Sequence, residues 1–525
     1  MDLFKSFTTV GGATLASRLL GFVREILIAS LIGAGPVADA FYAAFRFPNL
    51  FRRLFAEGAF NTAFVPLFAK ELEAGGHAAA ERFAREVFSV LLVTLLVLVA
   101  LMEIFMPLLV ATVIAPRFGT GTEKTLLTID LARIMFPYLL CMSLVAMLSG
   151  VLNAFRHYFI AALVPVLLNV VMIAVLLACE ALDTGNSALT GRVMAWGVAL
   201  AGFAQLGLVW IAAKRTGFTL AFQRPRLTGP VKRVLVLAVP AAIAGGITQI
   251  NLLIGQMIAS GQDGAIALLQ YADRIYQLPL GVIGIAIGVV LLPELARDLK
   301  SGNDQKAVTT QNHALEFAMF LTLPATAALM IMPGLISSVL YQRGAFDAVA
   351  ANGVAGALAA FAVGLPAFVL IKVLSPGFFA RENTRTPMNY AIINAVVNVV
   401  LSYILFQQFA HVGIAAATSI AAWANVAFLS IGLYRHGYWP FKPRAIRRCM
   451  MMLAASAIMA LVLYGLMEYL ADAGLLHGFV IRALALLSLV VIGGVIYLAA
   501  CRLTGAVEFG QMIRSFRRRR HTAGE

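Results

Sequence analysis

The chain has 525 residues, of which 61% are hydrophobic and only 12% are charged. A chain this long and this apolar is not a single soluble domain, and it belongs in a lipid bilayer. The formal net charge of +15 would suggest nucleic acid as the partner of a soluble protein. In a membrane protein an excess of Lys and Arg first reflects the loops that stay in the cytoplasm, so we expect no nucleic-acid partner.

Hydropathy predicts fourteen membrane-spanning helices, because a helix needs about 20 apolar residues to cross a hydrocarbon core of ~30 Å. The first span is expected to remain in the mature chain, since Arg18, Arg24 and Glu25 interrupt it and no signal-peptide cleavage site follows. In chain order the predicted spans cover residues 6–32, 39–69, 85–114, 128–155, 159–181, 192–213, 231–260, 265–295, 306–339, 348–379, 386–406, 412–434, 445–469 and 479–502.

The basic residues of the connections are divided unequally between the two sides of the membrane. With the N-terminus placed in the cytoplasm, the even-numbered connections and the C-terminal tail contain most of them, and the longest such connection is the basic stretch 214–233. The positive-inside rule therefore predicts that both termini are cytoplasmic and that the number of spans is even. The odd-numbered connections contain only Arg117, Lys124, Arg192, Arg343 and Arg482.

An internal repeat relates the first six spans to the next six. Residues 65–72 (VPLFAKEL) resemble residues 292–299 (LPELARDL), which lie 227 positions later. At an offset of 229, the repeat matches Pro137, Arg156 and Asn169 with Pro366, Arg385 and Asn398. Because each half has an even number of spans, the two halves are predicted to face the same way in the membrane. Two such lobes favour a transporter over a receptor built from one bundle.

The repeat divides the chain into five predicted parts. They are an N-terminal lobe with the first six spans (residues 1–216), a basic cytoplasmic linker (217–233), a C-terminal lobe with the next six spans (234–440), two spans outside the repeat (441–503) and a basic cytoplasmic tail (504–525). The predicted fold class is an all-α polytopic membrane protein with fourteen transmembrane helices, in two pseudo-symmetric six-helix lobes plus two C-terminal helices.

Charged residues within the predicted spans are the strongest functional signal. A charged side chain at the centre of a bilayer costs at least ~2.5–3.5 kcal/mol, so such residues are expected to have a function. Most are basic and lie in the first, second and eighth spans: Arg18, Arg24 and Glu25; Asp39, Arg46, Arg52, Arg53 and Glu57; and Asp273 and Arg274. Lys372 in the tenth span is a weaker signal, which fits either a cavity residue or a lysine that extends to the headgroups.

Two interpretations of the buried arginines remain. Helical spacing allows Arg53 and Glu57 to pair at i,i+4, and it leaves four arginines with fewer local acids than they need: Arg18, Arg24, Arg52 and Arg274. These side chains can extend towards headgroups or form ion pairs between helices. Alternatively, guanidinium groups converging from three helices form a basic cavity suited to phosphate, and the positive charge then implies an anionic ligand.

Five motifs allow a more specific interpretation: residues 17–25 (SRLLGFVRE), 33–35 (GAG), 38–41 (ADAF), 47–60 (FPNLFRRLFAEGAF) and 271–274 (YADR). Together they resemble the MurJ (MviN) family of lipid II flippases, and the resemblance covers the whole chain. It implies the fold of the multidrug/oligosaccharidyl-lipid/polysaccharide (MOP) exporter superfamily, with two lobes around a cationic central cavity. The positions that match the family's functional charges are Arg18, Arg24, Asp39, Arg52, Arg53, Glu57 and Arg274.

The same resemblance implies the function. The family moves the undecaprenyl-pyrophosphate-linked peptidoglycan precursor, lipid II, from the cytoplasmic to the periplasmic leaflet by alternating access. We therefore expect a multi-pass protein of a bacterial inner membrane that serves cell wall biogenesis, with lipid II and membrane lipids as partners. The last two helices are expected to form a hydrophobic groove for the lipid tail. We further expect a monomer that works with the cell-wall synthesis machinery.

Three alternatives are weighed against this interpretation. A drug or cation exporter of the same fold would place unpaired acids, rather than arginines, in its cavity. A membrane enzyme would need an acidic metal-binding cluster or a nucleophile with a base, and neither is found in the sequence. A scaffold or receptor would not require charged side chains near the middle of the membrane. No cofactor or metal is predicted. Some members of the family bind sodium through carboxylates on the seventh and eleventh helices. Here the seventh span, residues 231–260, contains no acid, and the eleventh, residues 386–406, offers only asparagines.

Overall fold

The computed structural model describes residues 3–53 and 60–506; for 3–10, 61–62, 241–245, 247–248, 285–286 and 288–290 it describes the backbone alone. Throughout these residues the chain forms helices joined by short connections, and no described residue lies in a strand. The chain divides into two compact units. Unit 1 comprises Met1–Gln270 with Arg343–Ala350, and unit 2 comprises Tyr271–Gln342 with Ala351–Glu525.

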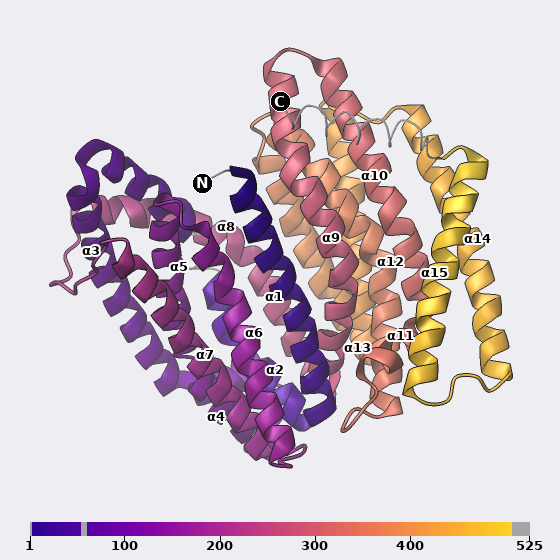
Figure 1. The fold of residues 1–525 in the computed structure, drawn as a ribbon, viewed down its shortest axis with the longest axis horizontal. Coiled ribbons are helices and arrows are strands. Elements are labelled where there is room, and N and C mark those ends of the chain that lie inside the picture. The colour runs from indigo at the N-terminus through magenta and orange to yellow at the C-terminus, as the bar shows by residue number, and fades with distance from the viewer. Residues whose placement is uncertain (1–2, 54–59, 507–525) are drawn as a thin grey trace. The chain divides into compact units, whose positions relative to one another are not determined.

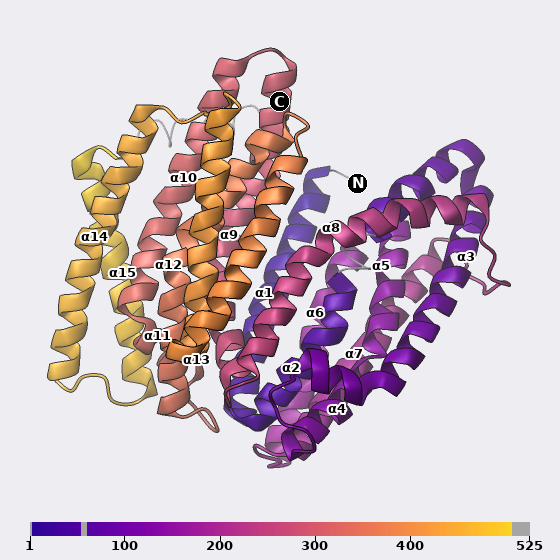
Figure 2. The same cartoon turned by 180° about the vertical axis from the view of Figure 1, so that it is seen from behind.

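Unit 1 is a bundle in which α1 packs along α6, α6 along α7, and α7 along α5 (Figure 1). In the same unit α2 packs against α4, and α3 packs against both α5 and α8, as the reverse view also shows (Figure 2). The helices of this unit are α1 (Leu3–Ile32), α2 (Pro36–Phe51), α3 (Asn61–Leu109), the π-helix η2 (Val110–Ile114), α4 (Glu123–Met135), α5 (Tyr138–Ala154), α6 (Tyr158–Ala181), α7 (Ala188–Arg215), α8 (Gly229–Ala259) and the first turns of α9 (Ala265–Lys300).

Unit 2 contains the rest of α9 and the C-terminal helices. Here α14 packs on α10 and on α15, and α15 also contacts α10 and α11. Tyr497 on α15 donates a hydrogen bond to the carbonyl oxygen of Phe320 on α10 at 2.9 Å, which ties the last helix to the unit. The further helices are α10 (Asp304–Ile331), α11 (Pro333–Tyr341), α12 (Ala348–Phe379), α13 (Arg385–Arg435), α14 (Pro443–Asp472) and α15 (Phe479–Thr504).

The helices are apolar on most of their faces, which is expected when lipid replaces water as the solvent. Within the described residues, nine helices or end-to-end helix pairs are long and apolar enough to cross a bilayer. Two of them, α3 and α13, are too long to be single spans and contain a break in the helical backbone. The breaks lie at Gly76 (φ 67°) and Ala410 (φ 52°).

Left-handed backbone conformations recur at matching places in the two sequence halves. The first half has six connections, five between its predicted spans and one after its last span. Each of them contains a residue with positive φ. The corresponding connection of the second half also contains one. The matching residues are Gly33 and Gly264, Gly76 and Gly302, Gly119 and Gly344, Arg156 and Glu382, Asp183 and Ala410, and Gly217 and Gly437. In five of the six pairs the separation is 225–231 residues, close to the offsets of 227 and 229 at which the sequences repeat.

Candidate functional site

Arg24 on α1 is the most deeply buried of the predicted arginines whose burial the structure describes, with 7% of its surface exposed. Its Nη1 donates a hydrogen bond to Oδ1 of Asn169 on α6 at 3.0 Å. Its Nη2 donates to Oε1 of Glu25 at 2.8 Å, which makes a buried ion pair. The hydroxyl of Tyr42 on α2 donates to the other oxygen of Glu25 at 2.7 Å. Side chains from three helices, all in unit 1, therefore meet at this pair.

The ion pair gives Arg24 a partner that helical spacing did not indicate. Helical spacing counted Arg24 among four arginines with fewer local acids than they need, because adjacent residues do not share a helix face. The arginine side chain is long enough to turn back to the adjacent Glu25. Burial of such a pair is tolerated when further hydrogen bonds satisfy both groups, and Tyr42 and Asn169 provide them here.

One nitrogen of the Arg24 guanidinium is without a partner among the described residues. This nitrogen, Nε, is buried. A buried donor without an acceptor costs about 1–3 kcal/mol, and more when the group is charged. An oxygen of an anionic ligand would satisfy this donor with a charge-assisted hydrogen bond. This geometry fits the phosphate-binding role that the sequence suggested for Arg24.

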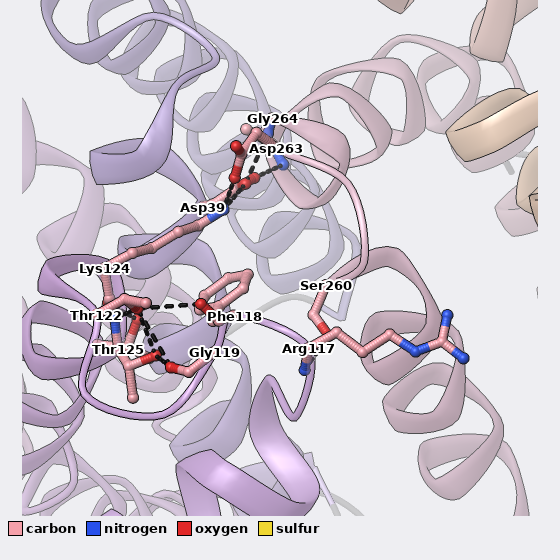
Figure 3. Close-up of polar contacts among 12 residues, drawn as sticks. Asp39, Arg117, Phe118, Gly119, Thr122, Lys124, Thr125, Ser260, Asp263 and Gly264 are labelled. Carbon is pink, nitrogen blue, oxygen red and sulfur yellow. Dashed lines mark hydrogen bonds and ion pairs between the residues drawn. The ribbon is translucent and has the colours of Figure 1, made fainter.

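Asp39 has a separate set of partners at the start of α2 (Figure 3). Its side chain is fully buried, and Oδ2 lies 2.7 Å from Nζ of Lys124 on α4. Oδ2 also accepts from the backbone N–H of Gly264 at 2.7 Å, and Oδ1 accepts from that of Ala267 at 3.0 Å. These amides open α9, so Asp39 caps a helix that is distant in sequence. Lys124 in addition contacts Asp263, whose side chain is exposed.

Sequence reasoning missed the role of Lys124, which it counted only as a marker of topology. Lys124 follows Thr122, the N-cap of α4, whose hydroxyl accepts from the backbone N–H of Thr125. The ammonium also lies 4.0 Å from the centre of the Phe118 ring, a favourable cation–π contact. One signal could have identified it. Lys124 is a basic residue on the side of the membrane that was predicted to contain few of them.

The remaining predicted residues of the first two helices are less buried. Arg18 on α1 is exposed. Arg46 on α2 is half-buried, and its Nη2 donates to Oε1 of Gln270 in the first turns of α9 at 3.1 Å. Both residues belong to unit 1, so Arg46 joins α2 to the beginning of α9 within that unit.

The end of α2 contains the two adjacent arginines. Arg52 is half-buried, and its Nε donates to Oδ1 of Asn49 at 2.8 Å. Arg53 is exposed. Glu57, its predicted partner, lies outside the described residues.

Three predicted residues lie in unit 2. Asp273 and Arg274 on α9 are half-buried, and Asp273 accepts a hydrogen bond from Gln277, one turn further along α9. Lys372 on α12 is exposed, and its side chain extends over the backbone of Gly284 on α9. A Cβ atom at Gly284 would overlap the end of the lysine, so only glycine leaves this path open.

The described residues include no group of three or more His, Cys, Asp or Glu arranged to bind a metal ion. The four cysteines are free thiols, and three of them are buried. An apolar groove lies between the ends of α14 and α15 in unit 2. It is lined by Leu470, Leu475, Ile481, Leu484, Leu487 and Ile492.

Solved structures identify the fold as that of a helical multi-pass membrane transporter. The chain is similar to a lipid II flippase MurJ in an inward closed conformation, with a TM-score of 0.77 and 26% sequence identity over 94% of this chain and 98% of that one. It is also similar to an inward-facing multidrug resistance MATE family transporter of the MOP superfamily, with a TM-score of 0.66 and 17% identity over 81% and 95% of the two chains. The second similarity concerns the fold alone.

Sequence comparisons define the family. A family model described as lipid II flippase MurJ matches residues 28–485. A probable lipid II flippase MurJ of Rhizobium tropici is 52% identical over 99% of this chain and 98% of its own length. A lipid II flippase MurJ of Burkholderia cenocepacia is 34% identical over 90% of each chain. The chain belongs to the MurJ lipid II flippase family, which confirms the resemblance predicted from its motifs.

Proposed function

We propose that this protein moves lipid II from the cytoplasmic to the periplasmic leaflet of a bacterial inner membrane by alternating access, for cell wall biogenesis. The observation that carries the proposal is the family match, which extends over residues 28–485 and includes the predicted charges of α2, α9 and α12. The activity is transport and involves no covalent step, so no catalytic residue or cofactor is required.

The proposed substrate-binding and cavity residues are Arg18, Arg24, Asp39, Arg52, Arg53, Glu57 and Arg274, with Glu25, Arg46, Asp273 and Lys372 in secondary roles. Arg24 is the best supported, because its buried Nε is a donor without a partner among the described residues. A pyrophosphate group offers several acceptor oxygens to guanidinium donors. Asp39 is proposed to act differently, since both its oxygens already have partners from the protein.

We propose that the chain crosses the membrane fourteen times, with both termini in the cytoplasm. The breaks at Gly76 and Ala410 support this count, because each lies between two consecutive predicted spans, 39–69 and 85–114 in the first case and 386–406 and 412–434 in the second. The matching left-handed residues support two lobes of six spans each, residues 1–216 and 234–440. The basic linker 217–233 and the tail 504–525, most of which lies outside the described residues, are assigned to the cytoplasm.

The two spans at 441–503 are proposed to hold the polyprenyl tail of the cargo. The apolar groove between α14 and α15 supports this role, since it offers a hydrocarbon chain only apolar side chains and one serine. We further propose that the protein is a monomer in contact with membrane lipids and the cell-wall synthesis machinery. It has no nucleic-acid partner in this proposal.

The deciding experiment is transport by the purified full-length protein in proteoliposomes. Fluorescent lipid II is placed in one leaflet, and its arrival in the other is followed by its accessibility to a membrane-impermeant quencher. Flipping well above that of protein-free vesicles is expected, and the wild-type gene should restore growth to a flippase-depleted strain. Absence of lipid II movement, with transport of another polyprenyl-linked glycan or of a cationic drug, would instead establish the alternative of a MOP-fold exporter with a different substrate.

A further inference from the structure

We infer that Asn169 is a positioning residue that fixes the guanidinium of Arg24 for the anionic group of the cargo. This inference rests on the proposed function. Asn169 lies on α6, is 6% exposed, and accepts a hydrogen bond from Nη1 of Arg24 through Oδ1 at 3.0 Å. The two residues are 145 positions apart in the sequence, so only the packing of α1 against α6 brings them together.

The orientation of the Asn169 amide is determined by the backbone. Its Nδ2 donates to the carbonyl oxygen of Ser17 on α1 at 2.9 Å and to that of Pro165 on α6 at 3.1 Å. Both amide hydrogens therefore have acceptors, and only the oxygen can face Arg24. Turning the amide over would direct its NH₂ group at the guanidinium and its oxygen at two carbonyl oxygens. The helix backbones thus fix the one acceptor that Arg24 meets on this side.

The second contact of the guanidinium is fixed in a similar way. Nη2 of Arg24 donates to Glu25, and the hydroxyl of Tyr42 holds the other oxygen of that carboxylate. Each terminal nitrogen of the guanidinium therefore has a partner in the protein, and Nε is the nitrogen that has none among the described residues. Such an arrangement fixes the plane of the guanidinium and leaves one edge for a ligand.

The neutral side chain at position 169 is important for the charge of the site. Glu25 already offsets the charge of Arg24, and a carboxylate at position 169 would make this cluster negative and repel pyrophosphate. An amide holds the guanidinium without adding charge. Positioning before binding also reduces the conformational entropy that the long arginine side chain would lose when the cargo arrives.

A double-mutant cycle tests the inference, because it measures whether Asn169 acts through Arg24. The variants are Asn169→Ala, Arg24→Ala and the double variant, each as full-length protein in detergent micelles. Binding of fluorescent lipid II is measured together with the melting temperature. We expect Asn169→Ala to weaken binding about tenfold, or about 1.4 kcal/mol. In the Arg24→Ala background the same substitution should change binding less than about twofold.

Asn312 on α10 offers a matched control for the loss of a buried amide. It is also 6% exposed, and it makes three hydrogen bonds, to the carbonyl oxygens of Val308 and Pro440 and from the backbone N–H of Lys442. Asn312→Ala should lower the melting temperature to a similar extent as Asn169→Ala and leave lipid II binding unchanged. This comparison separates positioning from a general loss of stability.

The outcomes are distinct. The positioning role would be overturned if Asn169→Ala weakened lipid II binding equally in both backgrounds, or if it lowered the melting temperature without changing the affinity. In either case, lipid II binding by the wild type would still support the proposed function. Failure of the folded wild-type protein to bind or flip lipid II would overturn the proposed function and, with it, the role assigned to Asn169.

Discussion

Nζ of Lys124 lies 2.7 Å from Oδ2 of Asp39, and this ion pair joins the first turn of α2 to the first turn of α4. The carboxylate is fully buried and the ammonium nearly so. Without Lys124, the charge of Asp39 would be stabilised only by the two amides at the start of α9. The pair is therefore predicted to be one of the main polar contributions to the stability of unit 1.

Lys124→Ala is expected to destabilise the protein by about 3–5 kcal/mol, because it leaves a buried carboxylate without its countercharge. The measurement is thermal unfolding of the detergent-solubilised protein. The loss should be much smaller in an Asp39→Asn background, where no charge is left uncompensated. Asp263→Asn is the control, since this 85% exposed partner of the same lysine should contribute no more than about 1 kcal/mol. A similar loss in the wild-type and Asp39→Asn backgrounds would contradict the assignment.

Arg24→Ala and Arg274→Ala are each expected to abolish transport while the protein still inserts and accumulates, because moving the anionic cargo across the membrane requires their charge and donors. Growth of a flippase-depleted strain and flipping in proteoliposomes are the measurements. Arg24→Ala also leaves Glu25 buried without its partner, so Arg24→Lys is the companion variant. It keeps the charge, loses the planar donor array, and should lower transport at least about tenfold.

Arg192→Ala is the matched control for these variants. Arg192 forms an ion pair with Asp130, and both side chains are 48% exposed. Its loss should change stability by no more than about 1 kcal/mol and leave growth intact. Full complementation by both Arg24→Ala and Arg274→Ala would exclude these residues from the cargo site.

Gly284→Ala is expected to displace the side chain of Lys372, which occupies the space where the new methyl group would lie. The displaced atoms are the end of a flexible side chain, so the fold should be retained, and alanine should stabilise α9 by up to about 1 kcal/mol. We expect faster modification of Lys372 by an amine reagent, measured by mass spectrometry, and reduced flipping. Gly255→Ala is the control, because nothing lies within 4 Å of its Cβ position; identical Lys372 reactivity in both variants would disprove the displacement.

The connection between α9 and α10 should give the protein a stability that depends on acid. Burial alone would raise the pKa of Asp298, but hydrogen bonds from Lys306 and Thr310 and the charges of Lys306 and Arg297 outweigh it and lower the pKa below the usual 3.8. Since the pKa is lower in the folded state, the contribution is present above pH 3.8 and is lost as the pH falls through the folded value. The difference in melting temperature between wild type and Asp298→Asn should shrink below about pH 4. A difference that is constant from about pH 7 to about pH 3 would refute this account.

The helices could be predicted from the sequence because lipid imposes a simple rule, that long apolar stretches form helices with every backbone group satisfied internally. The family could be predicted from contiguous motifs around Arg24 and Arg52. The partners of the charges could not, since they depend on packing between distant segments. Asn169 was recognised only as part of a repeat, and nothing in its local pattern relates it to Arg24, 145 residues away. Helical spacing counted Arg24 among the arginines with too few local acids, although the structure pairs it with the adjacent Glu25.

The paired left-handed residues indicate what a tandem gene duplication would preserve. Four of the six pairs are glycine in both halves, but Arg156 with Glu382, and Asp183 with Ala410, are non-glycine in both. An L-residue in this conformation costs roughly 1–2 kcal/mol. In these two pairs the side chains differ between the copies, yet each copy has kept a positive φ at the same place. At these two turns selection after duplication has therefore acted on the path of the chain more strictly than on the residues that follow it.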